Sequence, residues 1–334
     1  MNNLDYKSYL LAAIEDHRIF SGRREVSLTD EMPIGYGIDD NYVRCMGASI
    51  TSLCINNPEA NFVFHILANG LKDENQEKIK EMAERFHSNI HVYYINNEVF
   101  KNLPSQMHLP LPTYYRFILP ALLDVPRIIY LDADIICLGN IQDVFKMNMD
   151  NKVIMAVPDL ELLANKRICE LGLKNHTYFN AGMLIIDISK WNEQRVVDRV
   201  LTVLQQEPQK FRYLDQDALN LVLTGMVKYL GKEWNRINTP DMVDDGILFL
   251  HFAAHPKPWN IAWNKSNLCN DFTKKIYSTY ENLSPWANSS PAMPQNYKEM
   301  KNYAKCLLLA GDYPKGLQWY GRYLKTKLKI KVCR

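Results

Sequence analysis

The 334-residue sequence lacks a long hydrophobic run and any regular spacing of cysteines. No apolar stretch approaches the roughly 20 residues that a membrane-spanning helix needs, and residues 1–30 are too polar for a secretory signal. The seven cysteines are odd in number and form no C-x-x-C pair, which argues against a disulfide framework and a zinc site. We therefore expect a cytosolic protein whose cysteines are reduced thiols, mostly buried.

The sequence has almost no net charge, but its basic and acidic residues are unevenly distributed along the chain. The formal net charge is +2, yet residues 298–334 hold ten basic and two acidic side chains, a local charge of +8, which leaves −6 for the other 297 residues. A mildly acidic body argues against nucleic-acid binding, and the basic end predicts a local contact with an anionic partner. With 47% hydrophobic and 23% charged residues, the chain is not disordered, collagen-like or a coiled coil.

Apolar segments typical of strands alternate with segments of helical spacing from residue 32 onward. The expected strands are residues 32–38, 62–67, 90–95 and 127–131, and the expected helices are residues 42–56, 73–86 and about 115–123. This alternation predicts an α/β protein with an open, mostly parallel sheet, in which residues 32–38 form the first strand after a polar leader. Past Trp263 the alternation stops, and three prolines mark a linker to a helical, basic C-terminus.

Ligands of such sheets bind beyond the carboxyl ends of the strands, so polar residues that follow apolar strands are the first candidates. Asp132 and Asp134 follow one strand and are two residues apart, so in an extended segment both carboxylates face one side and can hold a hard cation. Ala133 between them is small enough to admit a ligand. Spacing alone is a weak signal, because it recurs at residues 215–217. Apolar flanks strengthen it, since buried carboxylates need a metal or donors.

Other candidate residues each have a structural and a functional interpretation. His251 is either a hydrogen-bonded histidine at a strand end or a metal ligand, and it shares a proline-stiffened loop with Lys257, whose charge suits phosphate. Arg116 is either a helix-surface charge or a group that reaches the same crevice. Asn180 either turns the chain, or the small residues after it let a ring lie against the backbone.

The triplet at residues 215–217 stands at the start of an expected helix. Asp217 fits the helix N-terminus, where a carboxylate offsets the helix dipole. Asp215 and Gln216 are better placed to face a ligand.

Taken together, these segments resemble family 8 of the retaining nucleotide-sugar glycosyltransferases, and within it the bacterial lipopolysaccharide core hexosyltransferases. The resemblance spans about residues 33–260, and the late Ser-Pro-Trp at 284–286 with the basic end also resembles the lipopolysaccharide branch. The matching segments are residues 37–42 (GIDDNY), 114–117 (YYRF), 130–134 (YLDAD), 178–191 (YFNAGMLIIDISKW), 215–217 (DQD) and 251–259 (HFAAHPKPW).

The resemblance implies a GT-A fold, Rossmann-like with a mixed, mostly parallel sheet, and a helical basic C-terminal extension. It divides the chain into a leader (1–32), a catalytic domain (33–265) and a linker with the basic helical region (266–334). It also implies metal-dependent transfer of a hexose from a UDP-sugar with retention of configuration, which forms an α-linkage. Glucose is the favoured hexose and galactose the next.

Residue roles follow from the same resemblance. Asp132, Asp134 and His251 are expected to hold Mn²⁺ or Mg²⁺ against the diphosphate, and Lys257 to bind phosphate oxygens. The other residues expected to contact the donor are Gly37, Asp39 and Asn41 near uracil and ribose, Ala133, Ala181 and Ala254 where the backbone is approached, and Arg116, Asp159, Asn180, Asp215 and Gln216 around the sugar. Ala254 departs from the glycine usual in the family.

The implied chemistry leaves the mechanism of retention open. Cleavage of the anomeric C–O bond leaves negative charge on UDP and oxocarbenium character on the sugar, so the metal and Lys257 stabilise the leaving group. Gln216 is a poor nucleophile, which favours front-face attack with its carbonyl dipole supporting the cation. Asp159 and Asp215 remain alternative nucleophiles.

The acceptor implied by the resemblance is the lipopolysaccharide core, which is membrane-embedded and phosphorylated. Apolar residues at 317, 320, 324 and 328 keep helical spacing among lysines, so the tail is either a solvated helix packed on the catalytic domain or a peripheral contact with anionic lipid. We favour the contact, which places the protein on the cytoplasmic face of the bacterial inner membrane. A glycogenin-like self-glucosylating protein and a non-catalytic nucleotide-sugar or glycan-binding protein remain alternatives.

Overall fold

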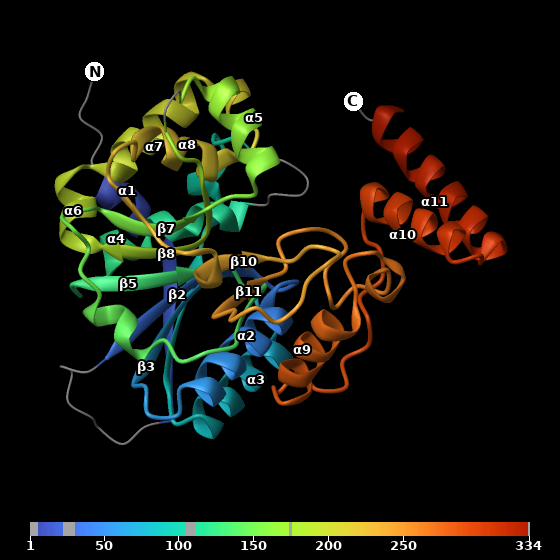
Figure 1. The fold of residues 1–334 in the computed structure, drawn as a ribbon, viewed down its shortest axis with the longest axis horizontal. Helices are drawn as coiled ribbons and strands as arrows, with labels where there is room; N and C mark the ends of the chain where they lie inside the picture. Colours follow the sequence, from blue (N-terminus) through green and yellow to red (C-terminus); the bar gives the residue numbers. More distant parts are fainter. Residues whose placement is uncertain (1–5, 23–30, 105–110, 174–175, 333–334) are drawn as a thin grey trace.

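The structure is a computed structural model that describes residues 6–22, 31–104, 111–173 and 176–332. An eight-stranded sheet forms its centre, with strand order β1-β4-β3-β2-β5-β8-β7-β9 (Figure 1). Its strands are β1 (Ile14–Ser21), β2 (Met32–Asp39), β3 (Phe62–Asn69), β4 (Asn89–Ile95), β5 (Arg127–Leu131), β7 (Ile154–Pro158), β8 (Phe179–Asp187) and β9 (Val227–Tyr229). A three-stranded sheet, β10-β11-β6, joins β6 (Ile135–Cys137), β10 (Arg236–Ile237) and β11 (Phe249–His251).

The large sheet is mixed, as expected for the predicted α/β class. Strand β2 pairs in parallel with β3 and β5, β3 with β4, and β7 with β9, whereas β1–β4, β5–β8 and β7–β8 are antiparallel. Seven of the eight residues of β3 are buried, because both faces of a sheet of this kind are covered by other elements. Because β2 and β5 are parallel neighbours, their carboxyl ends lie at the same edge of the sheet, where the candidate residues are found.

Helices cover both faces of the large sheet and create two hydrophobic clusters (Figure 1). One face packs on α2 (Val43–Asn56) and α3 (Asp73–Arg85). The other face packs on α1 (Tyr6–Leu11), α4 (Leu119–Leu122), α5 (Glu161–Leu171), α6 (Ile188–Glu193), α7 (Val196–Gln206) and α8 (Leu214–Val222). The predicted elements at residues 42–56, 62–67, 73–86, 90–95 and 127–131 are all present at nearly these bounds.

Two expectations about the first third of the chain are corrected. Residues 32–38 are not the first strand, because β1 precedes them and pairs antiparallel with β4 at the sheet edge. The helix expected at about 115–123 is a 3₁₀ segment, η3 (Leu111–Phe117), followed by the short α4. Pro120 explains this interruption, since it removes a backbone N–H from a continuous helix and stands in the first turn of α4. Residues 1–5 and 23–30 of the expected leader lie outside the described residues.

Beyond the small sheet the chain is helical. Helix α9 (Asp271–Asn282) contacts α2, and Trp286 lies against Gly47 of α2. A hairpin of α10 (Tyr297–Leu309) and α11 (Tyr313–Val332) follows and projects from the body of the protein (Figure 1). The described helices include none with the length and hydrophobicity needed to cross a membrane.

The described cysteines form no disulfide, in agreement with the sequence. Cys45, Cys137 and Cys306 are buried and Cys169 is exposed. Cys333 lies outside the described residues.

Candidate active site

A cavity of about 380 Å³ opens at the carboxyl ends of β2 and β5. Most of the residues predicted from the sequence line it: Gly37, Asp39, Arg116, Asp132, Ala133, Asp134, Asp159, Asn180, Gln216, His251, Ala254 and Lys257. Three predicted residues do not. Asn41 lines a neighbouring cavity of about 480 Å³ that shares Asp39 and Tyr42 with the first, and Ala181 and Asp215 lie behind the wall.

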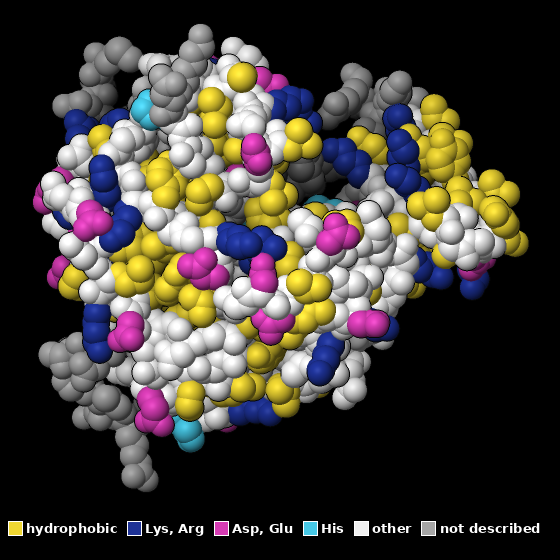
Figure 2. Space-filling model, viewed as in Figure 1, with side chains coloured by type: hydrophobic (Ala, Val, Ile, Leu, Met, Phe, Trp, Pro, Cys, Tyr) yellow, Lys and Arg dark blue, Asp and Glu magenta, His cyan; other side chains and the backbone are white. Residues whose placement is uncertain are grey.

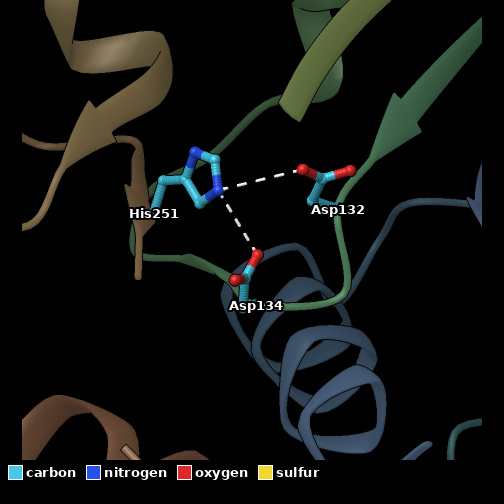
Figure 3. Close-up of side chains that lie close together, drawn as sticks. All are labelled: Asp132, Asp134 and His251. Carbon is cyan, nitrogen blue, oxygen red and sulfur yellow. Dashed lines mark ion pairs between the residues drawn. The ribbon is translucent and has the colours of Figure 1, made fainter. Parts of the chain in front are cut away.

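The two aspartates and His251 converge from three places in the fold (Figure 3). Asp132 directly follows β5, Asp134 directly precedes β6, and His251 is the last residue of β11, opposite Ile135 of β6. One ligand atom from each lies within 4.8 Å of the others. The Nε2 atom of His251 is 3.3 Å from Asp134 Oδ1 and 4.0 Å from Asp132 Oδ2. The pairing of β11 with β6 therefore assembles the cluster.

Asp134 is buried, and its second oxygen is held by Lys257. The Lys257 ammonium donates to Asp134 Oδ2 at 2.5 Å and to the carbonyls of Phe252 and Ala253. Burial alone would raise the pKa of the Asp134 carboxyl, but the charge of the Lys257 ammonium outweighs it and holds that pKa well below its usual range. The carboxylate is therefore ionised and available to a cation.

Arg116 links Asp132 to Asp215 beneath the floor of the cavity. Its guanidinium is 3.1 Å from Asp132 Oδ1 and 3.0 Å from Asp215 Oδ2, it contacts the Ala181 carbonyl, and it lies 4.3 Å from the centre of the Tyr130 ring. Burial raises the pKa of Asp215, and Arg116 opposes this shift. Of the two interpretations of Arg116, the structure therefore supports the one in which it reaches the crevice.

One wall of the cavity is a network of amides and a carboxylate. Gln216 donates to Asp159 Oδ2 at 2.9 Å and to the Tyr178 hydroxyl at 3.0 Å, and its Oε1 accepts from the Ala181 N–H. Asn180 donates to the same Asp159 oxygen at 3.3 Å. These bonds fix the orientation of Gln216 and Asp159 toward the cavity.

The wall beside β2 is shaped by small residues and one buried ring. A Cβ on Gly37 would stand 2.8 Å from the Pro112 carbonyl, so a larger residue there would push η3 away. Asp39 accepts from the backbone and side-chain amides of Asn41 at 2.9 and 3.3 Å. The Tyr42 ring packs edge-on against Trp259, with 5.5 Å between centroids, and separates the two cavities.

Asp217 does more than offset a helix dipole. It is fully buried, accepts two bonds from Arg167 at 2.6 and 2.9 Å, and also accepts from the Tyr178 hydroxyl and the Tyr213 N–H. This ion pair ties α5 to α8 beneath the site. Its partner Arg167 could not be found from the sequence, because it reads as one charge of an ordinary amphipathic helix.

Sequence reasoning also missed Asn235, whose Oδ1 lies 3.0 Å from His251 Nδ1. It lies in a short 3₁₀ segment, η6 (Lys232–Asn235), 16 residues before His251. No local pattern marks it.

The cluster fits a divalent cation. Carboxylates are the ligands that Mn²⁺ and Mg²⁺ sites prefer, and an imidazole ligates divalent transition metals. The His251 ring also lies in a space that only glycine leaves open, since a Cβ on Gly182 would stand 2.4 Å from His251 Cε1. The imidazole is therefore held in place before any ion binds.

Comparison with protein-family models assigns the chain to a family. The model of glycosyl transferase family 8 matches residues 33–262, more than half of the chain. The chain belongs to glycosyltransferase family 8. The model of the family 8 C-terminal region matches residues 273–327, which include α10 and most of α11.

The curated family 8 relatives include lipopolysaccharide hexosyltransferases of both donor types. The chain is 28% identical to the lipopolysaccharide 1,2-glucosyltransferase of Escherichia coli K12 over 87% of this chain and 90% of that protein. It is 29% identical to the lipopolysaccharide 1,3-galactosyltransferase of Salmonella typhimurium over 90% and 92%. The predicted resemblance is therefore confirmed, and the chain is a glycosyltransferase.

Solved structures confirm the predicted GT-A fold. The chain resembles the structure of the galactosyltransferase LgtC in complex with donor and acceptor sugar analogs, with a TM-score of 0.66 and 22% sequence identity. The similarity covers 80% of this chain and 99% of LgtC. The helical C-terminal region that was expected to extend this fold is present as α9, α10 and α11.

Proposed function

We propose that this family 8 glycosyltransferase transfers a hexose from a UDP-sugar to the lipopolysaccharide core, with retention and formation of an α-linkage. The observation that carries the proposal is the convergence of Asp132, Asp134 and His251 in a cavity that Arg116 and Lys257 also line. A site with two carboxylates, an imidazole and two fixed cations suits a metal–diphosphate group. Relatives of both kinds match equally well, so either hexose fits the comparisons; we keep glucose as the first donor to test and galactose as the next.

Bound Mn²⁺ or Mg²⁺ would supply Lewis-acid stabilisation of the departing diphosphate. Asp132, Asp134 and His251 would hold the ion. The Lys257 ammonium bonds Asp134 and the carbonyls of Phe252 and Ala253, so it would exchange one of these bonds for a phosphate oxygen when the donor binds. Because charge on the leaving group is neutralised as it develops, a separate acid to protonate it is not required.

The nucleotide would lie along β2, with the diphosphate toward the metal. Asp39 and Asn41 would contact uracil and ribose, and the small residues Gly37, Ala133 and Ala254 leave the backbone accessible. Since Asp39 lines both cavities and Asn41 only the second, the uridine would extend from the first cavity toward the second.

The donor sugar would lie against the wall formed by Arg116, Asp159, Asn180 and Gln216, with Ala181 and Asp215 behind it. We favour front-face attack, in which the amide of Gln216 supports the oxocarbenium ion. Asp215 is a poorer nucleophile than Asp159, because its oxygens face Thr113 and Arg116 and it does not line the cavity. Asp159 stays as the alternative nucleophile.

The hairpin would bring the enzyme to an anionic membrane surface that carries the acceptor. Its inner face packs Tyr303 and Trp319 near Ala262, whereas its outer face exposes apolar side chains one helical turn apart. The exposed apolar residues are Leu309, Tyr313, Leu317, Tyr320, Leu324 and Leu328. Figure 2 shows hydrophobic side chains gathered over the hairpin with Lys and Arg side chains beside them.

An apolar stripe beside lysines is typical of interfacial helices. Each basic residue near an anionic surface contributes about 1 kcal/mol. We therefore place the protein at the cytoplasmic face of the inner membrane, with residues 255–257 beside α10, because both line the second cavity.

The test is release of UDP from a panel of UDP-sugars, with Mn²⁺ or Mg²⁺ against EDTA and with or without truncated core oligosaccharide. We expect metal-dependent release from one hexose donor, increased by the acceptor and lost in Asp134→Asn. Binding of UDP-sugars without release under every condition would favour a non-catalytic binding protein.

A further inference from the structure

A buried chain of hydrogen bonds ends on the face of His251 that points away from the two aspartates. It runs from the Gly182 N–H through Asn180 and Asn235 to His251 Nδ1. The three side chains are 8%, 3% and 2% exposed, so water does not replace these contacts. The proposed function gives a role to Asn180 and His251 but none to Asn235.

The Gly182 N–H sets the donor and acceptor of every hydrogen bond in this series. A backbone N–H can only donate, and Gly182 N–H lies 3.0 Å from Asn180 Oδ1, so that atom is the amide oxygen. The same oxygen lies 2.9 Å from Asn235, which must therefore present its NH₂ group. Asn235 then turns its own oxygen toward His251 Nδ1 at 3.0 Å.

The far side of Asn180 sets the same direction independently. Its NH₂ group faces Asp159 Oδ2 at 3.3 Å, and an ionised carboxylate only accepts. Reversing the Asn180 amide would place two donors against each other at Gly182 and two acceptors against each other at Asp159. Both ends of the chain therefore permit only one arrangement.

We propose that Asn235 is a positioning residue that fixes the tautomer of His251. Because Asn235 Oδ1 can only accept, the neutral imidazole of His251 carries its proton on Nδ1 and leaves the lone pair of Nε2 free. That lone pair faces Asp134 Oδ1 at 3.3 Å and Asp132 Oδ2 at 4.0 Å. Three electron-rich atoms that converge in this way favour a cation between them.

The proposal rests on the proposed metal-dependent transfer, and it adds a specific device to it. Metal-bound histidines commonly donate their second N–H to a fixed acceptor, and removal of such acceptors typically weakens metal binding by about 10- to 100-fold. Here the acceptor is an amide whose orientation is set by the same Asn180 that contacts the Asp159 and Gln216 wall. The metal ligand and the donor-sugar wall therefore share one rigid hydrogen-bond chain.

The first test uses the protein without metal and needs no turnover. We would label the histidines with ¹⁵N and record the ring nitrogen shifts at about pH 8.5, where ordinary imidazoles are neutral, with His251 assigned from the His251→Gln spectrum. We expect the Nδ1–H tautomer at His251. The Nε2–H tautomer would overturn the proposal.

Two substitutions at Asn235 separate its two hydrogen bonds. Asn235→Asp keeps the acceptor for His251 but turns an acceptor toward Asn180 Oδ1, so we expect the Nδ1–H tautomer to persist and Mn²⁺ affinity to fall less than in Asn235→Leu. Asn235→Leu loses both bonds, and we expect mixed tautomers and about 10- to 100-fold weaker Mn²⁺ binding by calorimetry or electron paramagnetic resonance. Equal losses in the two variants would overturn the proposal.

Asn57→Leu is the matched control, because Asn57 is as buried as Asn235 and bonds Leu53, Gly139 and Ile141 away from the cluster. We expect it to lower stability without changing the His251 tautomer. If Asn235→Leu does not fold, the unmodified protein and Asn235→Asp still decide. UDP release together with an Nε2–H tautomer at His251 refutes only the proposed role of Asn235. The predicted tautomer without turnover supports the role of Asn235 and refutes the proposed function.

Discussion

Gly182→Ala tests how closely the His251 ring is fitted against β8. A Cβ at position 182 would stand 2.4 Å from His251 Cε1, and 3.0 Å from both His251 Nδ1 and Asn180 Oδ1. The backbone of Gly182 is not in the left-handed region, so alanine brings a steric conflict and little backbone strain. The substitution therefore acts on the position of the imidazole.

The size of the effect follows from these distances. Ordinary van der Waals contact begins at about 3.4 Å, so the ring must move by about 1 Å. Misplacement of a reacting or binding group by about 1 Å can cost about 100-fold in rate. We expect kcat/KM for UDP release to fall by about 100-fold and Mn²⁺ binding to weaken.

The matched control is Gly47→Ala in α2. Its Cβ would stand 2.2 Å from Trp286 Cε3, which is a clash of similar size far from the cluster in sequence. We expect Gly47→Ala to lower the melting temperature while Mn²⁺ affinity stays unchanged. If Gly182→Ala leaves Mn²⁺ affinity and turnover unchanged, the reasoning that glycine makes room for the metal ligand is refuted.

Three further predictions concern stability and membrane contact. Burial, followed by the nearby His91 and His17, lowers the pKa of His65 to about 3 in the folded protein. Because a histidine in the unfolded chain has a pKa of about 6.5, protons bind the unfolded chain first as the pH falls, and the free energy of unfolding should drop by about 2 kcal/mol from pH 7 to pH 5. His65→Gln should remove this loss in urea titrations. Asp217→Asn leaves Arg167 without its buried partner and should lower the free energy of unfolding by about 3–5 kcal/mol. Replacing exposed Leu317 and Leu324 together by serine should weaken binding to anionic vesicles in flotation assays.

Each of these predictions has a matched control. His176→Gln changes an exposed histidine and should leave the acid sensitivity in place. Asp187→Asn alters a partly exposed helix cap, where asparagine caps as well as aspartate, and should cost well under about 1 kcal/mol. Ile19→Ser removes an exposed apolar side chain on β1 and should not affect vesicle binding. Equal effects of a variant and its control would contradict the corresponding prediction.

The parts of the fold that the sequence predicted are those with a local signal. Strand β3 is a continuous apolar run and α3 has charged residues around an apolar face, so each could be recognised alone. Strand β1 could not, because most of its side chains are exposed and it has no apolar alternation. It is a strand only because β4 offers it a free edge.

The same distinction applies to the site. Asp132 and His251 were predicted because each lies at the end of an apolar strand, where ligands of α/β sheets bind. Asn235 and Arg167 act through partners 16 and 50 residues away, so only the folded chain reveals them. The contact of Asp215 with Thr113 rather than with the cavity is likewise a result of tertiary packing.

The most direct test of the central claim is analysis of the product. Truncated lipopolysaccharide core would be incubated with the protein, Mn²⁺ and either UDP-glucose or UDP-galactose, and examined by mass spectrometry and by the anomeric proton signal in NMR. We predict one added α-linked hexose, lost with EDTA and in Asp134→Asn. A β-linked product, transfer that persists in EDTA, or hexose attached to the protein's own tyrosines would contradict the account.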